Sequence, residues 1–457
     1  MRHKIVLLLS LIATQDLAAQ PSNRLQTEID RRSKELEAKV VAWRRDFHEH
    51  PELGNRELRT SKIVAEHLQK LGLEVKTGVA HTGVVGVLRG GRPGPVVALR
   101  ADMDALPVTE EVDLPFKSTV KTQYNGQEVG VMHACGHDNH VAILMGVAEM
   151  LAAMKAEIPG TVKFIFQPAE EGPPLGEKGG APMMLEEGAF TNPKVDAVFG
   201  LHVFPMEVGH VEYRSGGLMA SSDNFYITVR GRQTHGALPW NGIDPIVTAS
   251  QIVMGIQTLT SRQTDLTLTP AVVTVGMMRG GIRTNIVPDS VEMAGTIRAF
   301  DEGVRAQLHE RLTRLAESIA VANGATASVR IQKMTPVTYN DPGLTSRMIP
   351  TLERVLGKES VTVGRPTTTA EDFSFSQQAA PGLFFFIGGT PKENLGKAAP
   401  NHSPKFFVDE AMLVPGMRSL ANLAVDFLSA PRPRKNGVRR HFGKTGSDAI
   451  SCARNGV

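Results

Sequence analysis

The chain contains very little cysteine. Its 457 residues include only Cys135 and Cys452, too few for the disulfide framework that stabilises many small exported proteins. Cys452 lies in a basic C-terminal segment without apolar periodicity, so we do not expect it to pair with Cys135. Cys135 stands in "VMHACGHDNH", two residues before His137. A chemical role would explain why this thiol stays unpaired.

Long apolar runs are also absent beyond the N-terminus. No later stretch holds the roughly 20 uninterrupted apolar residues that a membrane-spanning helix needs, so no integral span is expected. The N-terminus has basic Arg2 and Lys4, a short apolar run from Ile5 to Ala13, and small residues up to Ala19. This order is typical of a signal peptide over residues 1–19 and predicts export to the periplasm or the medium. The alternative is that these residues begin the first helix.

The chain also lacks a strong charge of either sign. Its formal net charge of +3 includes a tail, residues 431–457, with seven basic residues and one acid, and a slightly basic signal segment. The body between them therefore carries a net charge of −4. A mildly acidic body gives no reason to expect a nucleic-acid partner. The tail has no apolar period and is predicted to be disordered.

Strand-like and helix-like segments alternate through most of the chain. Residues 26–212 and 333–430 contain short apolar strands separated by amphipathic helices, which is typical of an α/β sheet. Residues 213–332 follow the order β-α-β-β-α-β, typical of a small ferredoxin-like α+β module. The sequence therefore predicts an α/β domain interrupted by an inserted α+β domain.

Potential metal ligands follow several predicted strands. In an open α/β sheet, ligands bind beyond the carboxyl ends of the strands, so side chains at these ends should meet. Taken alone, each fragment has an ordinary explanation, such as a core histidine or a solvated carboxylate pair. Their shared position favours a common site. The candidates are Asp102 and Asp104 in "RADMDALP", Cys135 and His137 in "HACGHD", Glu170 and Glu171 in "FQPAEEG", His202 in "FGLHVFP" and His402 in "PNHSPKFF".

The adjacent glutamates are the most informative of these candidates. Neighbouring carboxylates beside a buried strand repel each other unless a cation is present. If one binds a divalent ion, the other can take a proton from water, whose pKa such an ion lowers from about 15.7 towards 7. Glu170 and Glu171 therefore supply the minimum groups for amide hydrolysis without a covalent intermediate.

Eight motifs of this chain, in this order, resemble those of the co-catalytic metallopeptidase family that includes aminoacylases and bacterial carboxypeptidases. The resemblance covers about residues 38–429 and points to the amidohydrolase branch, with hippurate hydrolases, N-acyl-amino-acid amidohydrolases and auxin-conjugate hydrolases. It implies a mixed-sheet catalytic domain with helices on both faces, and an inserted lid or dimerisation domain. The motifs are "RADMDALP", "HACGHD", "PAEEG", "GLHVFP", "GRQTHGALP", "TNIVPD", "TAEDFS" and "NHSPKFF".

The resemblance also implies a site for two divalent ions, with zinc, manganese, cobalt and nickel all compatible with its mixed ligands. Glu170 is implied as the general base. Asp102 stands where related carboxypeptidases have a ligand histidine, so we expect it behind the ligands or in the substrate pocket. Asp372 is interpreted as a helix cap. The implied ligands are Cys135, His137, Glu171, His202 and His402. A thiolate held between two ions would explain the unpaired cysteine.

The inserted module carries further candidates, His235 in "GRQTHGALP" and Asn285 in "GGIRTNIVPD". The resemblance implies that His235 reaches the active site of a partner subunit, or of its own subunit after domain closure, and stabilises the oxyanion. Asn285 is implied to hold the substrate, and Arg283 is interpreted as a partner for its carboxylate. A homo-oligomer, either a dimer or a tetramer, is therefore expected. A surface histidine remains the alternative for His235.

These features predict a metal-dependent amidohydrolase acting on linear amides. Its expected substrates are N-acyl or N-aroyl amino acids, including hippurate-like compounds, cleaved to a carboxylic acid and an amino acid by metal-activated water. The alternatives are a metallo-carboxypeptidase or dipeptidase of the same family, and a non-catalytic exported binding protein. The last would be expected to lack Glu170 or several ligands, and all of them are present.

Overall fold

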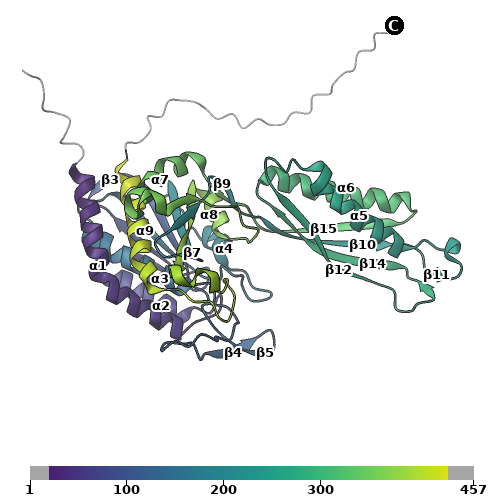
Figure 1. Cartoon of the computed structure of the whole chain (residues 1–457), viewed down its shortest axis with the longest axis horizontal. Helices are drawn as coiled ribbons and strands as arrows, with labels where there is room; N and C mark the ends of the chain where they lie inside the picture. Colours follow the sequence, from purple (N-terminus) through teal and green to yellow (C-terminus); the bar gives the residue numbers. More distant parts are fainter. Residues whose placement is uncertain (1–19, 431–457) are drawn as a thin grey trace, which may run out of the picture.

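The computed structural model describes residues 20–430, with side chains from residue 24. The predicted signal peptide, the basic tail and Cys452 lie outside these residues. The described chain forms a larger and a smaller lobe connected by extended segments, and both of its ends lie on the larger lobe (Figure 1). None of the helices within residues 20–430 combines the length and apolarity needed to cross a bilayer.

The larger domain is built on an eight-stranded mixed sheet in the order β1-β2-β6-β3-β7-β18-β8-β17. The central strands β6, β3, β7 and β18 are parallel, whereas β1, β2 and β8 pair antiparallel with their inner neighbours. The bounds are β1 (Glu74–Val79), β2 (Gly83–Arg89), β3 (Arg92–Asp102), β6 (Pro159–Gln167), β7 (Ala197–Glu207), β8 (Val211–Tyr213), β17 (Val361–Val363) and β18 (Gly382–Thr390).

Helices cover both faces of this sheet because its central strands are apolar on both sides. In β18, Phe385 packs into the core on one face, while Phe384 and Phe386 pack into the core on the other. The first core includes side chains of α1 (Gln20–Glu49), α2 (Leu58–Lys70), α3 (His137–Ala153), α7 (Pro342–Leu356) and α9 (Leu413–Ser429). The second includes side chains of α4 (Gly180–Glu186) and α8 (Phe373–Ala379). The α/β class with helices on both faces is therefore confirmed.

The smaller domain has its own sheet and its own core. Its antiparallel strands follow the order β12-β14-β10-β15, the ferredoxin-like arrangement. Two helices pack against one face and enclose apolar side chains such as Phe225 and Leu312. The elements are β10 (Ser222–Arg230), α5 (Pro245–Gln263), β12 (Ala271–Gly280), β14 (Ser290–Ala299), α6 (Glu302–Ala322) and β15 (Thr326–Thr335).

Several short elements were not predicted from the sequence. Asn125 and Gly126 have φ values of +50° and +78°, which suits the tight turn of a hairpin. This hairpin joins β4 (Lys121–Tyr124) to β5 (Gln127–Gly130). Near the connection between the domains, β9 (Gly216–Met219) pairs with β16 (Thr338–Asn340). At the far end of the smaller domain, β11 (Thr234–His235) pairs with β13 (Ile286–Val287).

Candidate metal centre

The predicted ligands gather around the carboxyl ends of neighbouring strands. Strand β3 ends at Asp102, which is in register with Gln167, the last residue of β6. One detail of the prediction is wrong, because His202 does not follow its strand, β7. This strand continues to Glu207, and His202 lies within it opposite Phe386 of β18. Pairing with β18 extends the strand beyond the histidine.

Two histidines are oriented by backbone carbonyls so that one ring nitrogen of each stays available. His137 Nδ1 lies 2.8 Å from the Asp104 carbonyl oxygen, and His202 Nδ1 lies 2.8 Å from the carbonyl oxygen of the next residue, Val203. His137 Nε2 is buried and has no hydrogen-bond partner among the described residues. His202 Nε2 lies 3.3 Å from Cys135 Sγ. Neutral imidazoles fixed through one nitrogen are the usual metal-binding form of histidine.

The turn that carries Cys135 and His137 depends on a glycine. Gly136 precedes α3 with a φ of +89°, in the left-handed region. A Cβ atom there would lie 2.3 Å from Cγ1 of Val203 on β7. Only glycine therefore lets the chain reverse here while keeping the thiol against the strand that carries His202.

The remaining predicted ligands approach the same thiol from two loops. His402 Nε2 lies 2.9 Å from Glu171 Oε1, and the Glu171 amide donates to Asp104 Oδ2 over 3.0 Å. Ligand atoms of Cys135, Glu171 and His402 lie within 4.8 Å of one another. The same limit holds for Cys135, His137 and His202. Cys135 therefore belongs to two ligand groups, which is the arrangement expected of a bridging thiolate.

The electrostatics of the cluster are those of buried acids without enough positive charge. Burial, aided by Glu171, raises the pKa of the Cys135 thiol well above its usual range. Burial also raises the pKa of Glu170 well above its usual range. Although burial opposes it, Asp102 raises the pKa of His137 to about 10. A divalent cation would neutralise this surplus of carboxylates and ionise the thiol. The residues therefore fit a metal site in both ligand chemistry and charge.

Asp102 lies next to His137 and is held by His140 and Arg100. Its carboxylate is fully buried, 2.6 Å from His140 Nδ1 and 3.8 Å from His137 Nε2. His140 Nε2 accepts a hydrogen bond from the Val203 amide over 2.9 Å. Both nitrogens of His140 are thus occupied within the protein, which favours a structural role over a metal ligand. The position of Asp102 also argues against contact with substrate.

A buried arginine beneath the cluster was missed in the sequence. Arg100, on β3, lies 2.5 Å from Asp102 and 2.9 Å from both Glu371 and Asp372. The helix-cap interpretation of Asp372 is wrong for its side chain, which caps no residue of α8. The carboxylate instead accepts from Gln167 and from the Ala181 amide. An arginine inside an apolar strand, in "VVALRAD", was a signal that could have revealed this network.

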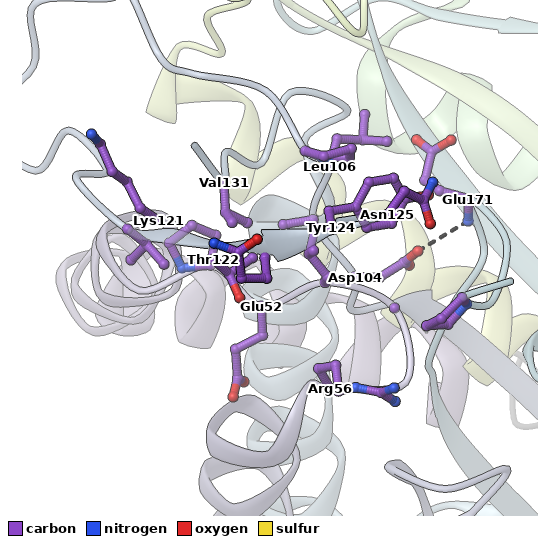
Figure 2. Close-up of a pocket in the computed structure, with 18 of the residues that line it drawn as sticks. Glu52, Arg56, Asp104, Leu106, Lys121, Thr122, Tyr124, Asn125, Val131 and Glu171 are labelled. Atoms are coloured by element: carbon purple, nitrogen blue, oxygen red, sulfur yellow. Dashed lines mark hydrogen bonds between the residues drawn. The ribbon is translucent and has the colours of Figure 1, made fainter. Parts of the chain in front are cut away.

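A cavity of about 390 Å³ opens beside the cluster (Figure 2). Asp104 and Glu171 form one side, and Tyr124 and Asn125 of the β4–β5 hairpin extend over them. The loop between α1 and α2 contributes Leu53. A cavity of this size, with apolar walls next to a few polar groups, suits a small organic ligand.

The structure does not bring the small-domain candidates to this cluster. His235, Arg283 and Asn285 are exposed, and the Gly236 amide donates to the Asn285 carbonyl over 2.9 Å. They thus lie together around the β11–β13 pair, at the end of the smaller domain farthest from the larger one (Figure 1).

Comparison with known proteins agrees with this geometry. Residues 98–426 match peptidase family M20/M25/M40. The "Thermostable carboxypeptidase 2" of Saccharolobus solfataricus is 45% identical, over 86% of this chain and 96% of the relative. The "IAA-amino acid hydrolase ILR1-like 2" of Arabidopsis thaliana is 37% identical, over 93% of each chain. A solved Bacillus subtilis structure, described as a dinuclear metal binding peptidase of the M20 family, is 35% identical. Its TM-score is 0.72, over 86% of this chain and 99% of that one.

Proposed function

Since the chain belongs to peptidase family M20/M25/M40, we propose that it is a metal-dependent amidohydrolase that cleaves N-acyl or N-aroyl amino acids. The observation that carries this proposal is the position of Cys135 in two ligand groups, neither of which includes Glu170, although Glu170 faces the same cluster. The relative named for IAA-amino acids supports an acyl-amino-acid substrate. The relative named as a carboxypeptidase keeps peptide cleavage as the second candidate.

We propose that Cys135, His137 and His202 hold one divalent ion, and Cys135, Glu171 and His402 a second. A dinuclear centre in a relative 35% identical supports two ions per subunit. Zinc, manganese, cobalt and nickel all suit a set of one sulfur, one carboxylate and three imidazoles. When bound, such ions polarise the scissile carbonyl and lower the pKa of water.

Glu170 is the proposed general base. Its Oε2 lies 3.9 Å from His137 Nε2, so it faces the cluster, and the Asp372 amide donates to its Oε1 over 3.4 Å. Burial raises its pKa, which suits a group that must both accept and release a proton. Glu170 takes the proton from the attacking water and returns it to the leaving amine. Asp102 is proposed to support the cluster from beside His137 without binding metal, with His140 holding its carboxylate in place.

The smaller domain is proposed to complete the site in a homo-oligomer. His235 would stabilise the oxyanion of a second subunit, Asn285 would hold the substrate, and Arg283 would pair with its carboxylate. A dimer or tetramer provides such a second subunit. We also propose export, because residues 1–19 have the order of a signal peptide.

A substrate panel with a base-deficient variant tests the function. The purified protein is loaded with each metal and offered N-acetyl, N-benzoyl and N-indolylacetyl amino acids together with dipeptides. We expect turnover of the acyl amino acids, loss on chelation, and recovery on adding metal back. Glu170→Ala should lower kcat by about 10²- to 10⁴-fold with its metal content unchanged. Near wild-type turnover by this variant would refute the assignment, and faster cleavage of dipeptides would select the second candidate.

A further inference from the structure

Glu57 stands at the start of α2, but its side chain does not cap this helix. Glu52 performs that role, since its carboxylate accepts from the Arg59 amide over 2.9 Å and from the Thr60 amide over 2.8 Å. Glu57 is nevertheless completely buried. Burying a carboxyl group costs free energy unless the group is hydrogen-bonded. The hydrogen bonds of Glu57 do not go to the amides of α2, so they must go elsewhere.

The buried carboxyl group of Glu57 reaches the turn that carries the two glutamates of the cluster. Its Oε1 accepts from the Ala169 amide over 2.9 Å, and its Oε2 accepts from the Thr82 hydroxyl over 2.5 Å. Ala169 has a φ of +50°, in the left-handed region that residues with a side chain seldom adopt. The hydrogen bond that the Ala169 amide donates to Glu57 therefore stabilises an unfavourable backbone conformation immediately before Glu170.

The same turn is held at both ends. Glu57 accepts from the amide of Ala169, and Asp104 accepts from the amide of Glu171 over 3.0 Å. Glu170 lies between these two anchored amides. We propose that Glu57 is a positioning residue that fixes the left-handed turn at Ala169 and thereby aims Glu170 at the substrate and Glu171 at the metal. This assignment rests on the proposed roles of those two glutamates.

The surroundings of Glu57 also indicate which substitution preserves its role. Burial raises the pKa of Glu57 to about 8, and the nearby negative charge of Asp104 contributes to this rise. The contacts of Glu57 require its shape and an acceptor oxygen for the Ala169 amide. Glutamine keeps both of these features, whereas alanine removes them.

The experiment compares Glu57→Gln and Glu57→Ala in the full-length, metal-loaded protein. We expect Glu57→Ala to lower kcat roughly 10²-fold with little change in KM, because small misplacement of a catalytic group has effects of this size. It should also weaken metal binding by about 10-fold or more, measured by equilibrium dialysis, because Glu171 shares the turn. Glu57→Gln should retain most of both properties.

Asp341→Ala is the matched control, because Asp341 caps α7 in the same domain through the Leu344 amide, away from the cluster. It should lower Tm without changing kcat or metal affinity. The proposal is overturned if Glu57→Ala keeps wild-type kcat and metal affinity, if Glu57→Gln loses as much as Glu57→Ala, or if Asp341→Ala loses as much as either.

If Glu57→Ala does not fold, Thr82→Val tests the proposal instead. It removes only the hydroxyl that donates to Glu57 Oε2 and keeps the carboxyl group itself. A smaller fall in kcat at constant KM is expected, and an unchanged kcat would overturn the proposal. The metal-binding measurement separates this inference from the proposed function. A wild-type protein that cleaves none of the substrates would refute the function, while the metal affinities of the Glu57 variants would still report on the turn.

Discussion

The two domains present their proposed catalytic groups in opposite ways. In the larger domain, Cys135, His137 and Glu170 are enclosed by a network of buried charges and directed hydrogen bonds. In the smaller domain, the side chains of His235 and Asn285 are exposed around the β11–β13 pair, away from the cluster of the larger domain. The first set is preorganised, whereas the second is proposed to act only when another surface completes it.

This difference reflects what each group has to do. Metal ligands must be held close together against mutual repulsion, which requires a rigid and buried framework. A group that contacts only the substrate can stay in solvent until domain closure or a second subunit brings it to the site. The larger domain should therefore respond to substitutions through stability and metal binding, and the end of the smaller domain through turnover alone.

The largest effect on stability is expected for Arg100→Met. This change leaves Asp102, Glu371 and Asp372 buried without their cation, and breaking such a network typically costs about 3–5 kcal/mol. Guanidinium unfolding measures the loss. Arg89→Met is the control, because Arg89 pairs with Glu74 on the exposed surface of the same sheet and should cost at most about 1 kcal/mol. Equal losses in both variants would contradict the idea of a charge-dependent site.

A smaller effect, confined to turnover, is expected for His235→Ala. Loss of an oxyanion donor should lower kcat about 10²-fold, with metal content and Tm unchanged. Mixing this variant with Glu170→Ala then tests where His235 acts. If it acts in a partner subunit, mixed oligomers regain activity, because one site combines an intact Glu170 with an intact His235. No recovery from proven mixed oligomers would mean closure within one subunit.

The smallest effect is expected at Asp223, in the smaller domain. Although burial opposes it, hydrogen bonds from Arg305 and His309 hold the pKa of Asp223 well below its usual value. A lowered folded-state pKa stabilises the fold above the usual aspartate pKa of about 3.9, and this contribution is lost as the pH falls below it. Asp223→Asn should therefore cost about 2 kcal/mol at pH 7.

The difference between Asp223→Asn and wild type should become smaller at pH 3, because the carboxylate is then largely protonated in the unfolded chain while Arg305 and His309 still keep it ionised in the folded protein. Urea unfolding of both proteins at the two pH values measures it. A difference that is the same at pH 7 and pH 3 would show that Asp223 acts through packing and not through its charge.

The sequence was a good guide wherever a local pattern carried the information. Apolar strands followed by polar residues predicted the α/β class, and the chain order of the segments predicted the ferredoxin-like arrangement of the smaller domain. It failed where a contact joins distant segments. Asp372 was interpreted as a cap because capping is a local pattern, yet its carboxylate binds Arg100 from a strand far away in the chain. Glu57 gave no local signal at all.

The sequence by itself therefore determined the types of groups available: an unpaired thiol, histidines and paired carboxylates near strand ends, with an inserted module between the two halves of the sheet. Only the tertiary structure decided how these groups meet. It brings Cys135 into two ligand groups, buries Arg100 under the carboxylates, and leaves His235 exposed on the other domain. The physical reason is that hydrogen bonds and charge pairs depend on distance in space, whereas patterns of hydrophobicity depend on position along the chain.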